Sequence, residues 1–119
     1  SKKIGKWIIE GAALADKEII QLTSLIKSVI VCNFEQELFS RVFVKSSTGF
    51  YKTQNDLPNG ATVPAIKMML ENASPLPVKA AGGVRTYGEA IEMIEMGVKR
   101  IGTSGAKMIA NGQNFNNEY

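Results

Sequence analysis

The sequence predicts an α/β fold built on a parallel sheet. Short apolar segments lie at residues 6–10, 41–45, 76–81 and 100–103, and segments with helical spacing of apolar residues lie between them. The apolar segments follow one another by roughly 25 to 35 residues, which favours βα units over hairpins. They also lack the apolar–polar alternation of a strand with one face in water, as expected for a sheet covered on both faces.

The first half of the chain contains one clear helix and one ambiguous stretch. Apolar residues recur at helical spacing over residues 16–28, and Asp16 is the predicted N-cap. Residues 29–32 fit either a strand or a helix end, and residues 33–39 fit a short helix. The sequence does not decide the structure between residues 30 and 40.

The second half contains more residues that form turns and cap helices. A polar, glycine-containing connection occupies residues 46–60. A helix then begins at Thr62 or Ala61. The next helix has Thr86 as its predicted N-cap, with Glu89 completing a capping box, and Gly97 fits its C-terminal position.

The order of elements gives four βα units over residues 1–110. Ser104 is the predicted N-cap of a last short helix, and residues 111–119 are predicted to be a frayed polar tail. Four units are half of an eight-unit TIM barrel, which takes about 250 residues. An open four-stranded sheet is the alternative.

Composition excludes several kinds of chemistry. The chain of 119 residues has no histidine, which excludes Ser-His-Asp and Cys-His catalysis within it, and a lone cysteine, Cys32, cannot build a zinc site. The net charge of +3 is scattered, so we expect no nucleic-acid partner. No apolar run reaches the roughly 18 residues of a membrane span, and we expect no membrane partner. The unpaired cysteine favours a cytoplasmic location.

Polar side chains follow the predicted strands at the edge where parallel sheets bind ligands. Lys45 ends one strand, Lys79 lies near the end of the next, and the two are 34 residues apart. Glu10 ends the first strand. A lysine at the end of an apolar strand either performs a task or only extends its amine to solvent, and both interpretations stay open for these residues.

Two glycine-rich turns follow the third and fourth strands, at residues 82–86 and 102–105. Each places backbone N–H groups ahead of a helix, a common anion site, and Arg85 can add a charge. The alternative is that the glycines only allow tight turns. Two such turns in succession match the phosphate site of many TIM barrels.

Two segments contain the lysines: Phe43-Val44-Lys45-Ser46-Ser47-Thr48-Gly49-Phe50 and Val78-Lys79-Ala80-Ala81-Gly82-Gly83-Val84-Arg85-Thr86. With two further motifs, in order, they resemble deoxyribose-phosphate aldolases, a family of class I aldolases. The first segment resembles the Schiff-base strand of this family, and the second resembles its second lysine strand. Arg100-Ile101-Gly102-Thr103-Ser104 resembles the last strand, and residues 6–10 resemble the strand before the Schiff-base strand. The resemblance therefore covers residues 6–110 and implies the C-terminal half of a TIM barrel, strands five to eight.

The resemblance also implies roles. Lys45 would form the imine with the substrate carbonyl, and Lys79 would lie beside it and depress its pKa. The substrate phosphate would be bound by Gly49, Gly82, Gly83, Arg85, Gly102 and Ser104. The reaction would be reversible cleavage of 2-deoxyribose 5-phosphate to glyceraldehyde 3-phosphate and acetaldehyde, with neither a metal nor an organic cofactor.

The sequence departs from the family pattern in three respects, of which the mildest is Ser46, where the family usually has Thr. The family's catalytic aspartate lies on an earlier strand, and neither Asp16 nor Asp56 matches its motif. Residues 31–41 are longer than the usual connection. A half barrel leaves sheet edges open, so we expect a homo-oligomer or association with the missing half. A non-catalytic phosphosugar-binding half barrel and an interaction fragment are the alternative functions.

Overall fold

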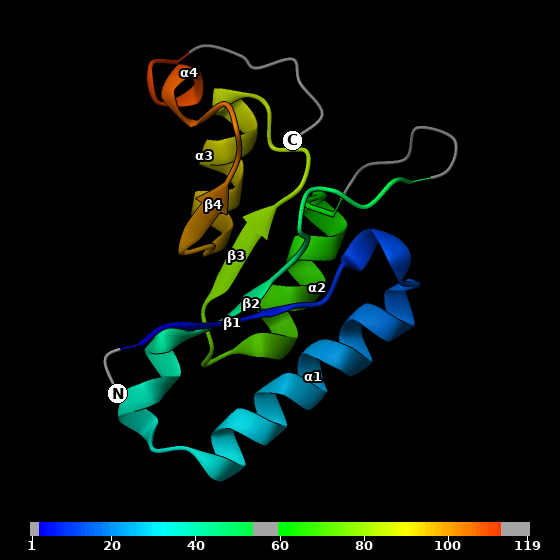
Figure 1. Ribbon diagram of the computed structural model, residues 1–119, viewed down its shortest axis with the longest axis vertical. Helices are drawn as coiled ribbons and strands as arrows, with labels where there is room; N and C mark the ends of the chain where they lie inside the picture. Colours follow the sequence, from blue (N-terminus) through cyan, green and yellow to red (C-terminus); the bar gives the residue numbers. More distant parts are fainter. Residues whose placement is uncertain (1–2, 54–59, 113–119) are drawn as a thin grey trace.

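The computed structural model describes residues 3–53 and 60–112 and contains one parallel sheet (Figure 1). Its strands pair in the order β1-β2-β3-β4, and every pairing is parallel. The strands are β1 (Gly5–Ile8), β2 (Val42–Lys45), β3 (Val78–Ala81) and β4 (Arg100–Gly102). The predicted parallel α/β fold is confirmed.

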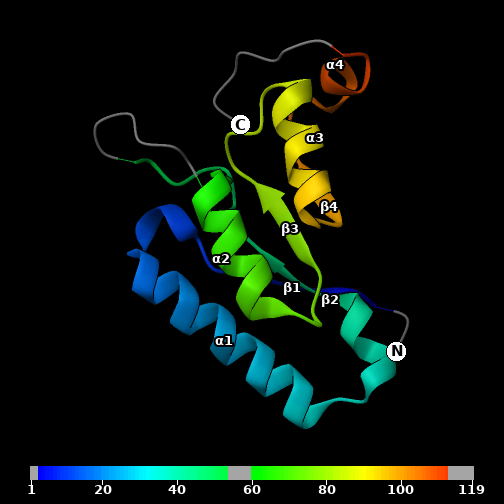
Figure 2. The same ribbon diagram turned by 180° about the vertical axis from the view of Figure 1, so that it is seen from behind.

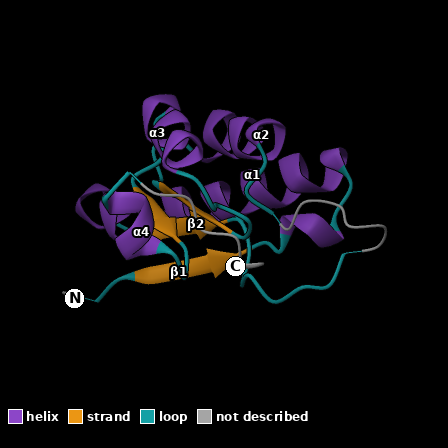
Figure 3. Ribbon diagram, turned by 90° about the horizontal axis from the view of Figure 1, so that it is seen from above, coloured by secondary structure: helices purple, strands orange, loops and turns teal. Residues whose placement is uncertain are grey.

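Helices connect the strands. The α-helices are α1 (Asp16–Asn33), α2 (Val63–Ala73), α3 (Tyr87–Met96) and α4 (Ala106–Ala110), and the 3-10 helices are η1 (Gly11–Ala13) and η2 (Gln36–Arg41). Figure 2 shows α1 and α2 side by side, and the view from above in Figure 3 shows α1, α2 and α3 on one side of the strands. Among the described residues, no helix combines the length and apolarity needed to cross a membrane.

Each strand pairs with its neighbour in sequence, so β1 and β4 are the two edges of an unclosed sheet. This topology is that of a half barrel, as expected for part of a TIM barrel. The predicted domain boundary at residue 110 stays a prediction. Of the predicted tail, residues 113–119 lie outside the described part of the chain.

The ambiguous stretch after residue 28 is resolved as helix. α1 continues to Asn33, so residues 29–32 are a helix end, and η2 then leads into β2. The burial of Ile30 explains the extension, because this turn packs an apolar side chain into the core that a stop at residue 28 would leave out.

Two predicted caps are wrong, and three are confirmed. α1 has Ala15 at its N-cap, where the Glu18 carboxylate accepts the Ala15 N–H at 2.8 Å, and Asp16 is the first helical residue. α4 has Gly105 at its N-cap and not Ser104. Three predictions from local chemistry hold: the Thr62 and Thr86 hydroxyls accept the N–H groups of Ala65 and Glu89, and Gly97 ends α3 at a φ of 117°.

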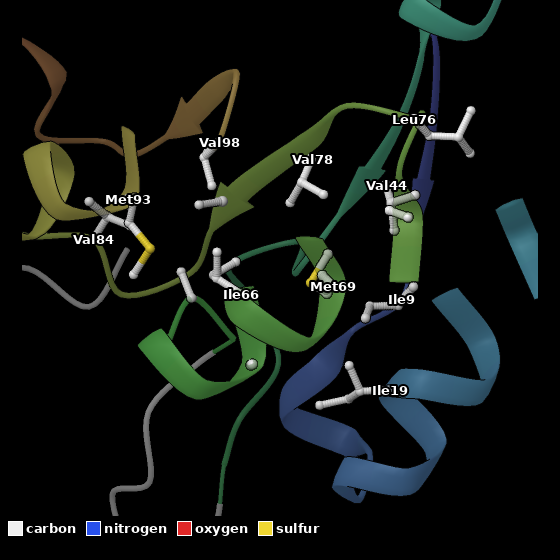
Figure 4. Packing of buried hydrophobic residues seen from close by; sticks show 14 of the residues in the cluster. Ile9, Ile19, Val44, Ile66, Met69, Leu76, Val78, Val84, Met93 and Val98 are labelled. Carbon is white, nitrogen blue, oxygen red and sulfur yellow. The ribbon is translucent and has the colours of Figure 1, made fainter. Parts of the chain in front are cut away.

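The core lies between the sheet and the three longer helices. Val44 and Val78 are register partners on the helix side of the sheet, at 0% and 1% exposure, and they pack with Ile66 and Met69 of α2 (Figure 4). In contrast, Trp7 of the edge strand is 51% exposed. The apolar segments were expected to be covered on both faces, but β1 is exposed throughout because the described chain supplies no neighbour beyond it.

We expect Ile66→Ala to lower the free energy of unfolding by about 2–5 kcal/mol, since it leaves a cavity at a fully buried position. Ile94→Ala makes the same chemical change at a side chain that is 54% exposed and should stay within about 0.5 kcal/mol. Urea denaturation measures both variants. Equal losses would contradict the packing described above.

Candidate active site

Lys45 and Lys79 lie next to each other on neighbouring strands. They are register partners in the pairing of β2 with β3, and neighbouring strands are about 4.8 Å apart. Register partners in a parallel pair point to the same face of the sheet, so the two amines share one surface. The strand ends that were predicted to carry the lysines therefore bring them together.

Two more cations share this face. Arg100 is the register partner of Lys79, and Lys6 is the partner of Phe43, which lies two residues before Lys45. The Arg100 guanidinium lies over the Phe43 ring at 4.6 Å from the ring centre. Among the residues described, none of these cations forms an ion pair, so this side of the sheet, here called the cationic face, carries unbalanced positive charge.

The environment acts on the titration of Lys79. Its partial burial lowers the pKa of Lys79 below the ordinary value of 10.5, and the nearby Lys45, Lys6 and Arg100 charges lower that pKa further. Burial and like charges both disfavour the ammonium form. The ammonium of Lys79 is therefore a stronger acid than that of an ordinary lysine.

Ser46 ties the ends of β2 and β3 together. Its hydroxyl donates to the Ala81 carbonyl oxygen at 2.6 Å and accepts the Ala81 N–H at 2.8 Å, and the side chain is fully buried. These bonds continue the ladder one step past the two lysines. They hold the chain after Lys45 against the chain after Lys79.

Glu10 reaches across from the end of β1 to the loop that follows Lys45. Its carboxylate accepts the Ser47 hydroxyl at 2.8 Å, the Thr48 hydroxyl at 2.8 Å and the Thr48 N–H at 3.2 Å. The Ser47 hydroxyl in turn accepts the Gly49 N–H at 2.8 Å. The loop is thus held by Glu10, which follows β1, and by the loop's own hydroxyl side chains.

Gly60 approaches the same loop so closely that a side chain would not fit. It has a φ of 106°, and a Cβ atom there would lie 2.6 Å from the Ser47 Cβ. The Ala61 N–H donates to the Gly82 carbonyl at 2.9 Å, so the start of α2 is bound to the turn after β3. The positive φ and the close approach to Ser47 each require a glycine at residue 60.

The two predicted glycine turns lie at the same edge of the sheet. Gly82 and Gly83 have φ values of 93° and 85°, which explains why glycines occupy both positions. The Thr103 hydroxyl donates to the Val84 carbonyl at 2.8 Å and accepts the Gly105 N–H at 3.1 Å. This threonine links the turn after β4 to the turn after β3.

The remaining predicted phosphate residues occupy this edge in different ways. Gly102 is the register partner of Ala81 at the end of β4, Arg85 precedes α3, and Ser104 is exposed just beyond β4. The N–H group of Gly49 is bound to Ser47, so its hydrogen bond is made within the loop. Asp16 lies in the exposed first turn of α1, and Asp56 lies outside the described residues.

Sequence reasoning placed Glu10 at this edge without assigning it a role, and it noted Ser46 only as part of the motif around Lys45. It did not single out Lys6 and Arg100, which the structure adds to the site. Lys6 and Arg100 could have been found by noting which residues of each strand face the same side as the two lysines, because side chains alternate between the two faces of a sheet. No local signal indicates the partners of Glu10 and Ser46. Among the described residues, no three metal-ligating side chains lie together.

We expect Gly60→Ala to destabilise the chain by about 1–3 kcal/mol, because alanine meets Ser47 and must hold a positive φ. Gly88→Ala is the matched control. Its Cβ would find nothing closer than the Thr86 hydroxyl at 4.0 Å, so it should be neutral or up to about 1 kcal/mol more stable. Thermal unfolding compares them, and equal effects would refute the close approach.

We expect Lys79→Met to raise the free energy of unfolding at neutral pH. The pKa of Lys79 in the folded chain lies below its unfolded value of 10.5. At a pH between the folded and the unfolded pKa, the unfolded chain binds more protons than the folded chain, so the stability of the wild type rises with pH. The variant loses this rise, and its advantage disappears above pH 10.5. Urea unfolding across this range measures it, with exposed Lys67→Met as control. A variant that keeps the wild-type pH slope would disprove the shift.

Curated proteins that are similar to this chain carry the name of the family that its motifs resemble. Deoxyribose-phosphate aldolase of Dictyoglomus turgidum is 41% identical over 111 residues, which are 92% of this chain and 43% of the relative. The enzyme of the same name from Streptococcus pneumoniae (strain Hungary19A-6) is 36% identical over 118 residues, which are 98% of this chain and 46% of the relative. No protein-family model matches the chain.

The similarity extends over nearly the whole chain, while the chain spans about half the length of these relatives. This share agrees with the half barrel seen in the topology. By sequence, the chain is a homologue of part of the deoxyribose-phosphate aldolases.

Proposed function

We propose that the chain carries the Schiff-base half of a class I aldolase that cleaves 2-deoxyribose 5-phosphate reversibly to glyceraldehyde 3-phosphate and acetaldehyde. The observation that carries this proposal is the pairing of Lys45 with Lys79 in register on one face of the sheet. The names of the curated relatives support the substrate class. The alternative is a half barrel that binds phosphosugars without catalysis.

In this proposal Lys45 is the nucleophile. Its neutral amine adds to the substrate aldehyde carbon, water leaves, and a protonated imine forms. Retro-aldol cleavage then breaks the bond between C2 and C3: the C3 hydroxyl loses its proton and becomes the aldehyde of glyceraldehyde 3-phosphate. The electron pair of the broken bond moves toward the imine nitrogen, and protonation at C2 and hydrolysis release acetaldehyde and restore the lysine.

Lys79 supports this chemistry as the neighbouring cation and as a proton carrier. Its lowered pKa means that its ammonium form gives up a proton more readily than that of an ordinary lysine. Among the described residues, no carboxylate pairs with either lysine, so the structure indicates no base beside them for the C3 hydroxyl proton. We assign that proton to a group outside the described residues.

The phosphate of the substrate is proposed to bind at the turns after β3 and β4. Gly82 and Gly83 place backbone close to the start of α3, where N–H groups favour an anion. Arg85 adds charge at the same place, and Gly49, Gly102 and Ser104 complete the proposed set. The cationic face also attracts an anionic substrate.

Association with the missing barrel half or with a second copy is part of the proposal. An apolar groove runs between β1 and α1 and is lined by Trp7, Ile8, Leu22, Leu25, Ile26, Val29 and Ile30. A second copy that closed the barrel would add four more cations to the same interior, whereas a different half can present carboxylates. The unbalanced charge therefore favours a non-identical partner.

We place the protein in the cytoplasm because Cys32 is exposed and unpaired.

Reduction of the imine tests the nucleophile. We expect 2-deoxyribose 5-phosphate followed by borohydride to leave one covalent adduct, and peptide mass spectrometry to place it on Lys45. Lys45→Ala should abolish the adduct, while Lys67→Ala, which removes an exposed lysine of α2, should keep it.

The outcome separates the two functions. A folded sample that binds the phosphosugar without an adduct would support the non-catalytic binding module. An adduct on Lys79 in place of Lys45 would keep the aldolase and overturn the assignment of its nucleophile.

A further inference from the structure

We propose that Glu10 is a positioning residue that fixes the conformation of the loop after Lys45, because its carboxylate can only accept hydrogen bonds. The inference rests on the proposed function, because it gives Glu10 a role in presenting the imine-forming lysine. Glu10 itself need not touch the substrate. Its effect passes through Ser47 and Thr48, which lie two and three residues beyond Lys45.

A carboxylate can only accept hydrogen bonds, and this fixes the direction of every bond around it. The Ser47 and Thr48 hydroxyls must both donate to Glu10. Their lone pairs are then available to the backbone, and they accept the N–H groups of Gly49 at 2.8 Å and Phe50 at 3.2 Å. One carboxylate therefore orients two hydroxyl groups, and these hydroxyls in turn bind the N–H groups of Gly49 and Phe50.

The backbone around Glu10 ties it directly to the lysine strand. The Ile9 N–H donates to the Lys45 carbonyl at 3.0 Å, and the Gly11 N–H donates to the Ser46 carbonyl at 2.8 Å. Both neighbours of Glu10 are thus bound to the two peptide groups on either side of Ser46, the first of which begins at Lys45. A change at Glu10 is felt at the lysine through these two bonds and through the loop.

Glu10 also holds an unfavourable backbone conformation. Its φ of 52° and ψ of 58° are left-handed, and it is the one described non-glycine residue with a positive φ. Glycine adopts this conformation without the side-chain penalty. The glutamate side chain at this position is therefore not required by the backbone, and the three hydrogen bonds account for its presence.

Two substitutions separate the roles of side chain and backbone. Glu10→Gly removes the carboxylate and relieves the backbone, so it should keep overall stability and release the loop. Glu10→Gln keeps one oxygen that can accept from Ser47 and the Thr48 N–H. Its amide nitrogen cannot accept the Thr48 hydroxyl and instead donates to the Thr48 oxygen, where it competes with the Phe50 N–H, so only that arm is weakened. Glu71→Gln makes the same chemical change at an exposed residue of α2 and serves as the control.

The test measures amide hydrogen exchange by NMR together with the rate of borohydride trapping at Lys45. In Glu10→Gly we expect the Gly49 and Phe50 amides to exchange about tenfold faster, while core amides keep their wild-type rates. In Glu10→Gln we expect faster exchange at Phe50 and not at Gly49. The trapping rate should fall about tenfold or more in Glu10→Gly, less in Glu10→Gln, and not in Glu71→Gln.

The two readouts keep the inference separate from the proposed function. Unchanged exchange at Gly49 and Phe50 in Glu10→Gly would overturn the role of Glu10. Wild-type trapping rates in a variant with a released loop would overturn it as well. If the wild-type chain gives no adduct while the exchange pattern is as expected, the aldolase proposal fails and the hold of Glu10 on the loop stands.

Discussion

The in-register parallel pairing of β2 with β3 is the constraint on which the rest of the site depends. Because the two strands run in the same direction, their carboxyl ends meet at one edge, and Lys45 and Lys79 become direct neighbours. A shift of one residue would place the two amines on opposite faces of the sheet. The buried hydroxyl of Ser46, bonded twice to Ala81, holds this register just beyond the lysines.

Much of the fold follows from local sequence, and the site follows only in part. Apolar segments at regular spacing predict the four strands, and Thr62 and Thr86 predict helix starts because a hydroxyl cap needs only nearby backbone groups. The end of α1 could not be predicted, since residues 29–32 suit a strand or a helix and packing decides between them. The wrong cap at Asp16 has a similar origin, because a carboxylate is also favourable one position later in the first turn.

For the site, sequence position predicts which residues lie at the ligand edge but not how they are bonded. The contacts of Glu10 join residues 37 and 38 positions apart, and no short-range pattern specifies them. The left-handed backbone of Glu10 is equally invisible in the sequence, because glutamate rarely adopts it. Arg100 and Phe43 come together for the same reason as the lysines, through strand register.

The pairing of the lysines has an electrostatic cost that shapes the whole face. Lys6, Lys45, Lys79 and Arg100 share it without a described counter-ion, and part of the cost appears as the lowered pKa of Lys79. Amine-reactive cross-linking with a short reagent tests this arrangement most directly. The account predicts one dominant link between Lys45 and Lys79, which disappears after the imine at Lys45 has been reduced. Links from Lys45 mainly to lysines outside the cationic face, or a Lys45–Lys79 link that survives imine reduction, would contradict it.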